Sequence, residues 1–229
     1  NNFGNPSSIH RYGQSAKAVI EKARKQIADK LVCSPGEIFF TGGGSESNNT
    51  VLKGILKSGD HFITSSIEHP SIMIPAEELQ NSGIDVTYVK PDHNGIIQLD
   101  SILNEIKENT KLISIMMVNN ELGTINPIVE IGDLAKSHNI LFHTDAVQAF
   151  GKIPLNVSEF SIDLLSISAH KLYGPKGVGI LYMRNGNSID PLISGGGQEK
   201  NLRAGTENVA GIAGLGFEKL VYDGLTKVF

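Results

Sequence analysis

The sequence predicts an α/β protein with three layers (αβα), in which helices cover both faces of a mainly parallel sheet. Short apolar runs recur along the chain, and most are separated by segments long enough to form a helix. The runs are nearly continuous in apolar residues, which is typical of strands that are buried on both faces. Ligands of such sheets bind beyond the carboxyl ends of the strands, so the residues that follow each run are the first candidates for a site.

The first predicted element is a helix, because apolar residues repeat at helical spacing between Val19 and Leu31. A Pro-Gly pair at positions 35–36 ends this stretch before a short strand, "EIFFT" at 37–41. A helix is also expected over Ile128 to His138. Further strands are expected at "HFITSS" (61–66), "DVTYVK" (85–90), "KLISIMMV" (111–118), "NILFHTDA" (139–146) and "DLLSIS" (163–168).

Composition indicates one large domain over residues 1–229, since 40% of the residues are hydrophobic and 19% are charged. A formal net charge of −4, without a block of like charges, argues against nucleic acid and membrane partners. Cys33 is the only cysteine, which excludes an intramolecular disulfide and a cysteine-rich zinc site and fits a cytoplasmic protein. The chain starts at "NNFGNP" without a methionine, so we expect that sequence upstream is missing.

A glycine-rich turn follows the first predicted strand, in "TGGGSESNN" at 41–49. Gly42, Gly43 and Gly44 allow a tight turn, and Ser45 falls near the start of the next helix, a geometry that suits a phosphate. The simpler interpretation is an ordinary turn with Ser45 as the N-cap. The spacings of a Walker loop and of a dinucleotide fingerprint are absent, so nucleotide binding is disfavoured.

Polar residues follow three further strands. His69 precedes Pro70, which is expected to begin a helix, and this histidine could either face the cleft or cap and pack. The segment "NNELGT" at 119–124 offers Asn120 to the cleft, or it is a turn with a solvated charge. Asp145 ends another run, and if a helix starts there Gln148 can point back toward the strand end. A carboxylate at the end of a buried strand needs a cationic or hydrogen-bonding partner.

The run at 163–168 delivers Ser168, His170 and Lys171 to a strand end. A lysine in a partly dry cleft is more easily deprotonated and can act as a nucleophile toward an aldehyde. The alternative is a solvated loop lysine, with Lys176 as an equally eligible charge. A lysine, an aspartate for a pyridinium nitrogen, a histidine for ring stacking and a hydroxyl-rich helix start are together the parts of a pyridoxal phosphate site.

Seven segments, in one order along nearly the whole chain, resemble the cysteine desulfurases among the class V aminotransferase-like, fold-type I pyridoxal phosphate enzymes. The segments are "FGNPSSIHRYG", "FTGGGSESNN", "SSIEHPSI", "VNNELGTINP", "HTDAVQAFGK", "SAHKLYGPKGVG" and "GGGQEKNLRAGTEN". The resemblance implies pyridoxal 5′-phosphate as cofactor, L-cysteine as substrate, a homodimer and a possible sulfur-acceptor protein. The sulfur would serve iron–sulfur cluster or thio-cofactor synthesis.

The resemblance also implies a role for each matched residue. Lys171 and His69 are the expected catalytic residues, Lys171 by holding the cofactor covalently and His69 by stacking on its ring. The remaining expected cofactor-binding residues are Asp145 at the pyridine nitrogen, Gln148 at the phenolic oxygen, Asn120 beside that oxygen and the substrate, Ser45, Ser168 and His170 at the phosphate, Gly44, and Thr206 at the phosphate of the neighbouring subunit.

Two family features have no match in the chain: the loop with the nucleophilic cysteine, and the arginine that binds the substrate carboxylate. We therefore expect a large cofactor-binding domain that is inactive alone, without the C-terminal small domain and the extreme N-terminus, and with Cys33 as a packing residue. Ser45 stands where many relatives have threonine, and it keeps the hydroxyl. Two alternatives stay open: another class V enzyme, such as a selenocysteine lyase or an aminotransferase, and a non-catalytic folding or dimerisation unit.

Overall fold

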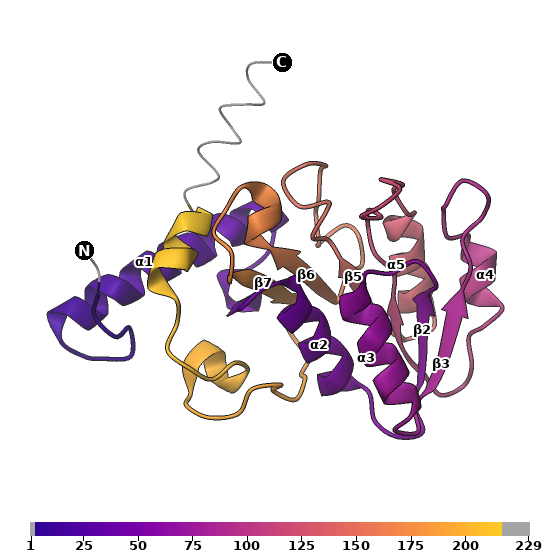
Figure 1. The fold of residues 1–229 in the computed structure, drawn as a ribbon, viewed down its shortest axis with the longest axis horizontal. Helices are drawn as coiled ribbons and strands as arrows, with labels where there is room; N and C mark the ends of the chain where they lie inside the picture. The colour runs from indigo at the N-terminus through magenta and orange to yellow at the C-terminus, as the bar shows by residue number, and fades with distance from the viewer. Residues whose placement is uncertain (1–2, 217–229) are drawn as a thin grey trace, which may run out of the picture.

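The computed structural model describes residues 3–216, so the ends of the predicted domain, 1–2 and 217–229, lie outside the described residues. Within this range one sheet has the strand order β1-β7-β6-β5-β4-β2-β3 (Figure 1). Its strands are β1 (Ile38–Thr41), β2 (His61–Ser65), β3 (Asp85–Val89), β4 (Thr110–Ser114), β5 (Leu141–Asp145), β6 (Leu164–Ser168) and β7 (Gly179–Met183). The labelled helices are α1 (Arg11–Leu31), α2 (Gly44–Ile55), α3 (Pro70–Gln80), α4 (Leu99–Leu103) and α5 (Ile128–Ser137), with short 3₁₀ segments η1 (Pro35–Glu37), η2 (Ala169–Leu172) and η3 (Gln198–Asn201), and residues 209–216 are also helical.

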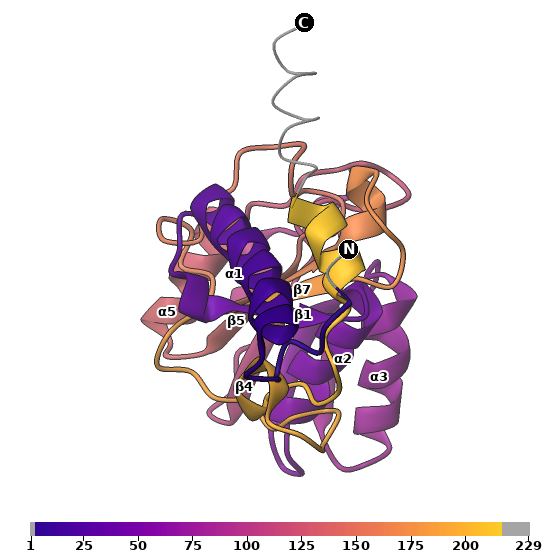
Figure 2. The ribbon, with the colours of Figure 1, turned by 90° about the vertical axis from the view of Figure 1, so that its left-hand side faces the viewer.

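Helices cover both faces of the sheet, as the sequence predicts (Figure 2). Neighbouring residues of a strand enter different cores: Ile38 and Phe40 belong to the core that includes α1, α4 and α5, whereas Phe39 packs in the core with α2 and α3. Burial on both faces explains why the strands are continuous apolar runs rather than alternating ones. Among residues 3–216, no helix combines the length and the apolar character that crossing a bilayer requires.

The expectation of a mainly parallel sheet is confirmed. Strands β2 to β6 pair in parallel, and β7 is antiparallel to both of its neighbours, β1 and β6. All six predicted strands are present, but the fourth ends at Ser114 instead of continuing to 118. The strand β7 was not predicted, although "GILYM" is itself a short apolar run.

Residues after Asp145 form turns instead of the helix considered above. The Asp145 carboxylate accepts a hydrogen bond from the backbone N–H of Val147 at 2.9 Å, a local turn contact. Gly151 has φ of +76°, which an α-helix cannot include.

The reversed direction of β7 determines where the site lies. Its first residue, Gly179, is paired with Thr41 at the end of β1 and with Ser168 at the end of β6. The carboxyl ends of β1 and β6 are therefore at the same edge of the sheet as those of β2, β4 and β5. A Cβ atom at Gly179 would lie 2.5 Å from the carbonyl carbon of Gly43, so only glycine allows the β1–α2 turn to pack this closely.

Candidate functional site

A cavity of about 350 Å³ opens at this edge of the sheet. It brings together nine of the ten residues predicted from the sequence, from segments that follow β1, β2, β4, β5 and β6. These nine are Gly44, Ser45, His69, Asn120, Asp145, Gln148, Ser168, His170 and Lys171, and the lining also includes Ser71, Met116, Glu121 and Val147.

Asp145 supplies a buried carboxylate to the wall of the cavity, with 5% of the residue exposed. Its Oδ2 accepts a hydrogen bond from Asn48 Nδ2 at 2.7 Å, and its Oδ1 accepts the one from Val147. Burial raises the pKa of this carboxyl, while the bonds from Asn48 and Val147 and the charge of His69 act in the opposite direction. These two bonds leave lone pairs on the carboxylate that a cationic or N–H group in the cavity can use.

The N-terminus of α2 forms another wall. Gly43 is the N-cap residue, and among the described residues no side chain caps this end. The interpretation of Ser45 as N-cap is therefore wrong; it is the second residue of the helix and lines the cavity. A Cβ atom at Gly44 would lie 2.7 Å from Val147 Cγ2, so glycine is needed for the close approach of α2. Free N–H groups at this end favour an anion.

Lys171 lies in η2, directly after β6. The two polar residues before it are linked to each other, because Ser168 Oγ and His170 Nδ1 are 2.8 Å apart. Burial and the positive charges of Lys171 and Lys176 lower the pKa of His170. Lys176, the alternative lysine, does not line the cavity. Lys171 therefore lines the same cavity as the N-terminal residues of α2, and its positive charge again suits an anion.

His69 both caps a helix and lines the cavity. It is the N-cap of α3, which begins at Pro70 as predicted, and its Nδ1 accepts a hydrogen bond from the backbone N–H of Ser71 at 3.1 Å. The capping interpretation and the cleft interpretation of this residue are thus compatible, because the ring borders the cavity while Nδ1 faces the helix.

The two asparagines after β4 have different positions. Asn119 is buried, and its Oδ1 accepts hydrogen bonds from the backbone N–H groups of Glu121 and Leu122, so it forms the turn. Asn120 and Glu121 line the cavity. Gln148 also lines it, and its Oε1 accepts a hydrogen bond from Lys152 Nζ at 2.9 Å.

Besides Lys176, two residues named in the sequence analysis, Thr206 and Cys33, lie outside this cavity. Thr206 borders a separate hollow of about 210 Å³ beside Arg203 and Gly205. Cys33 packs against the hydrophobic core, and burial, with the charges of Glu37 and Asp29, raises the pKa of its thiol to about 12. A thiol with so high a pKa is not a ready nucleophile.

Sequence reasoning missed Asn48 and Ser71, which contact the predicted residues. Both stand inside quoted motifs, three residues after Ser45 and two after His69, so their proximity to the site was visible. Their hydrogen-bond partners were not, because these lie on other elements.

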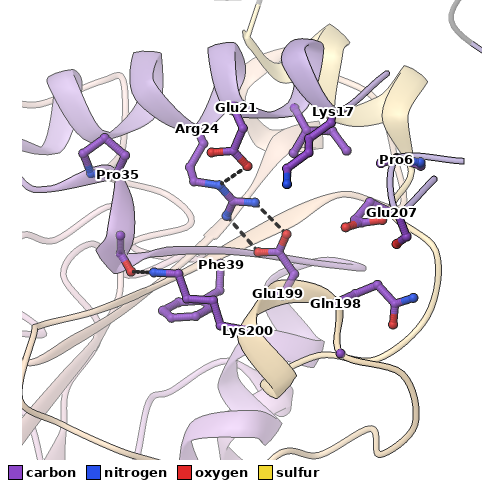
Figure 3. Close-up of a pocket in the computed structure, with 14 residues that line it drawn as sticks. Pro6, Lys17, Glu21, Arg24, Pro35, Phe39, Gln198, Glu199, Lys200 and Glu207 are labelled. Carbon is purple, nitrogen blue, oxygen red and sulfur yellow. Dashed lines mark hydrogen bonds and ion pairs between the residues drawn. The ribbon is translucent and has the colours of Figure 1, made fainter. Parts of the chain in front are cut away.

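A larger cavity of about 590 Å³ lies between α1 and η3, away from the strand ends (Figure 3). Its main feature is an ion pair in which Arg24 Nη1 and Nη2 bind the Glu199 carboxylate at 2.8 and 2.7 Å. These charges neutralise each other, so they do not mark a ligand site by themselves. Within residues 3–216, no cluster of histidine, cysteine and acidic side chains is arranged to hold a metal ion.

Comparisons with known proteins agree on one family. The model of the aminotransferase class-V family matches residues 1–219. The cysteine desulfurase IscS of Dictyoglomus turgidum is 52% identical over 93% of this chain and 55% of its own length. The solved structure of a NifS-like protein superimposes with a TM-score of 0.95 at 42% identity, over 99% of this chain and 64% of that one. A structure described as SspA in complex with cysteine has a TM-score of 0.92 at 46% identity, over 95% and 64% of the two chains. The chain spans about half the length of the curated relatives it matches.

Proposed function

The chain belongs to the aminotransferase class-V family, and we propose that its 229 residues form the pyridoxal 5′-phosphate-binding domain of a cysteine desulfurase. The observation that carries this proposal is the convergence of nine predicted residues on one cavity. The match to cysteine desulfurases in sequence and in structure supports it.

The residues of the cavity fit the cofactor at three separate points. The buried Asp145 carboxylate has lone pairs left for a protonated ring nitrogen. The uncapped N-terminus of α2, with Ser45, Ser168 and His170 beside it, suits the phosphate. Lys171 lines the same cavity and can hold an aldehyde covalently.

The bound cofactor would supply an electron sink for negative charge that develops on an amino acid. Asp145 would keep the ring nitrogen protonated, because its own charge is held by Asn48 and Val147. His69 would lie against the ring, and Gln148 and Asn120 would bind beside its phenolic oxygen. Burial of Asp145 keeps water from the carboxylate and strengthens its electrostatic effect.

L-cysteine is the proposed substrate, and the related structure with bound cysteine supports this choice. The sulfur would leave as a persulfide on a cysteine other than Cys33, which packs outside the cavity. Thr206 would reach the phosphate in the second subunit of a homodimer, in agreement with its position outside the cavity of its own chain. A sulfur-acceptor protein would receive the persulfide sulfur.

Borohydride reduction tests the cofactor assignment. The chain is incubated with pyridoxal 5′-phosphate, reduced and digested, and mass spectrometry locates the modified lysine. We expect the label on Lys171, its loss in Lys171→Ala, and its retention in the matched control Lys176→Ala, because only Lys171 lines the cavity. A label on Lys176 would show that the site is misassigned.

The substrate class is tested on the longer protein that contains this chain. With dithiothreitol present to reduce the persulfide, equal amounts of alanine and sulfide from L-cysteine would support a desulfurase. Alanine and selenide from L-selenocysteine alone would indicate a selenocysteine lyase, and amino transfer to a keto acid an aminotransferase.

A further inference from the structure

A line of hydrogen bonds joins two walls of the cavity, from Asp145 on β5 to His69 at the start of α3. Asn48 Nδ2 donates to Asp145 Oδ2 at 2.7 Å and to Ser71 Oγ at 2.8 Å. Ser71 Oγ in turn lies 2.8 Å from His69 Nδ1. The two outer residues are candidates for cofactor contact, whereas Asn48 and Ser71 connect them.

The orientation of the Asn48 amide follows from the two acceptors that it faces. Asn48 is fully buried, and both N–H groups of its amide have acceptors. Its Oδ1 has no hydrogen-bond partner among the described residues. Turning the amide over would take its N–H groups away from both acceptors, Asp145 Oδ2 and Ser71 Oγ. Asn48 therefore donates in both directions, so the line of bonds orients groups and does not conduct a proton.

The Ser71 hydroxyl receives one bond and gives another. Because its oxygen accepts from Asn48, its proton is free to point at His69 Nδ1. The backbone N–H of Ser71 donates to the same ring nitrogen at 3.1 Å. In a neutral imidazole one nitrogen donates and the other accepts. Two donors at Nδ1 make it the acceptor, so the ring proton is on Nε2.

We propose that Asn48 and Ser71 are positioning residues that hold His69 with its proton on Nε2 and fix the ring relative to Asp145. This inference deepens the proposed function and rests on it for the role of His69. With Nδ1 occupied, Nε2 is the nitrogen that can donate a hydrogen bond or a proton to an acceptor in the cavity. The ring cannot turn over without breaking both bonds at Nδ1.

His10 provides a comparison within the same chain. It is the N-cap of α1, and its Nδ1 accepts from the backbone N–H of Gly13 at 3.2 Å. This is the bond that His69 receives from the Ser71 backbone, but the structure shows no hydroxyl bound to His10 Nδ1 among the described residues. His10 therefore serves as a reference for the tautomer ratio of a ring that has the backbone hydrogen bond without the hydroxyl.

The tautomers can be measured in the free 229-residue chain by ¹⁵N NMR of the histidine rings, at a pH of about 8.5 where histidines are mostly neutral. We expect His69 to favour the Nε2–H form more strongly than His10 does. Ser71→Ala removes the hydroxyl and keeps the backbone bond, so the tautomer ratio should fall roughly two- to tenfold, the equilibrium effect of one neutral hydrogen bond. Ser71→Thr restores a hydroxyl and should restore the ratio.

Asn48→Leu tests the other half of the line, because it removes the donor to Ser71 at similar volume. It should lower the same ratio in the same direction as Ser71→Ala. The control is Ser82→Ala, at an exposed position just after the C-terminal end of α3, which should leave the ratio unchanged. Backbone amide spectra of each variant show that the fold is kept.

An unchanged His69 ratio in Ser71→Ala would overturn the proposal, and an unchanged ratio in Asn48→Leu would remove Asn48 from it. Neither result depends on cofactor binding. Borohydride labelling of Lys171 in the same proteins tests the proposed function separately. If Lys171 is not labelled but the tautomer ratio shifts in the variants, the cofactor site is refuted and the positioning role of Asn48 and Ser71 stands. If Lys171 is labelled but the ratio does not shift, only the positioning role is refuted.

Discussion

Removing Glu199 should destabilise the protein far more than removing a surface acid. Arg24 and Glu199 are almost completely buried, with 10% and 2% of their side chains exposed (Figure 3). Among residues 3–216, Glu199→Ala leaves the guanidinium with only Glu21 and the Ile38 carbonyl as polar partners, and it also removes the acceptor of the Phe40 N–H at 2.8 Å. Breaking a buried pair by deleting one partner typically costs about 3–5 kcal/mol.

The backbone around Glu199 adds to this expectation. Glu199, Lys200 and Asn201 have φ values of 43°, 57° and 68°, a left-handed conformation that is costly for residues other than glycine. The Glu199 carboxylate ties this segment to α1 and β1, so its loss should also release residues 198–206. Faster hydrogen exchange or proteolysis there would accompany the loss of stability.

Urea unfolding measures the free energy of Glu199→Ala, and Asp190→Ala is the matched control. Asp190 pairs with Lys57 at the surface, where the two side chains are 71% and 60% exposed, so its loss should cost only about 0–1 kcal/mol. The double variant Arg24→Met/Glu199→Leu should recover part of the lost stability, because no buried charge is left unpaired although the Phe40 N–H still lacks its acceptor. If Glu199→Ala costs no more than Asp190→Ala, the assigned role of the ion pair is wrong.

Three further predictions concern a buried acid, a glycine and the thiol. Burial, which outweighs the hydrogen bonds from Ser65 and Met116, raises the pKa of Glu68 from 4.5 to about 8. The folded state then holds this proton more tightly than the unfolded state, so the free energy of unfolding falls as the pH rises from about 4.5 to about 8. Glu68→Gln should remove this part of the pH dependence, measured by urea unfolding at several pH values. An unchanged pH dependence would contradict the prediction. Gly179→Ala should destabilise by about 1–3 kcal/mol and weaken pyridoxal phosphate binding measured by absorbance, since its Cβ would meet Gly43; wild-type affinity would argue against the packing described. Cys33 should react slowly with an alkylating reagent in the native chain at a pH of about 8, and its alkylation should not change cofactor binding. The 229-residue chain should not release sulfide from L-cysteine. Sulfide release that disappears in Cys33→Ala would show that Cys33 is the nucleophile after all.

Local patterns in the sequence were sufficient for the fold class and for most of the cavity. Strands buried on both faces must be apolar at nearly every position, so they are recognisable without knowledge of their neighbours. Parallel strands end at one edge, so Asp145, at the end of one apolar run, and Lys171, three residues after another, were expected to lie near each other. The β7 strand was missed although "GILYM" is a short apolar run, and its reversed direction could not be predicted because antiparallel and parallel strands that are buried on both faces have the same local composition.

The partners of the polar groups were decided by the tertiary structure alone. Asn48 bonds Asp145 across 97 residues of sequence, and Arg24 pairs with Glu199 across 175. Hydrophobic periodicity encodes which side of an element is buried, but a hydrogen bond also depends on which distant element packs there and at what distance. For the same reason the sequence determined that His69 lies at a strand–helix junction, while only the packing of α2 against α3 brought the Asn48 amide and the Ser71 hydroxyl together beside its ring.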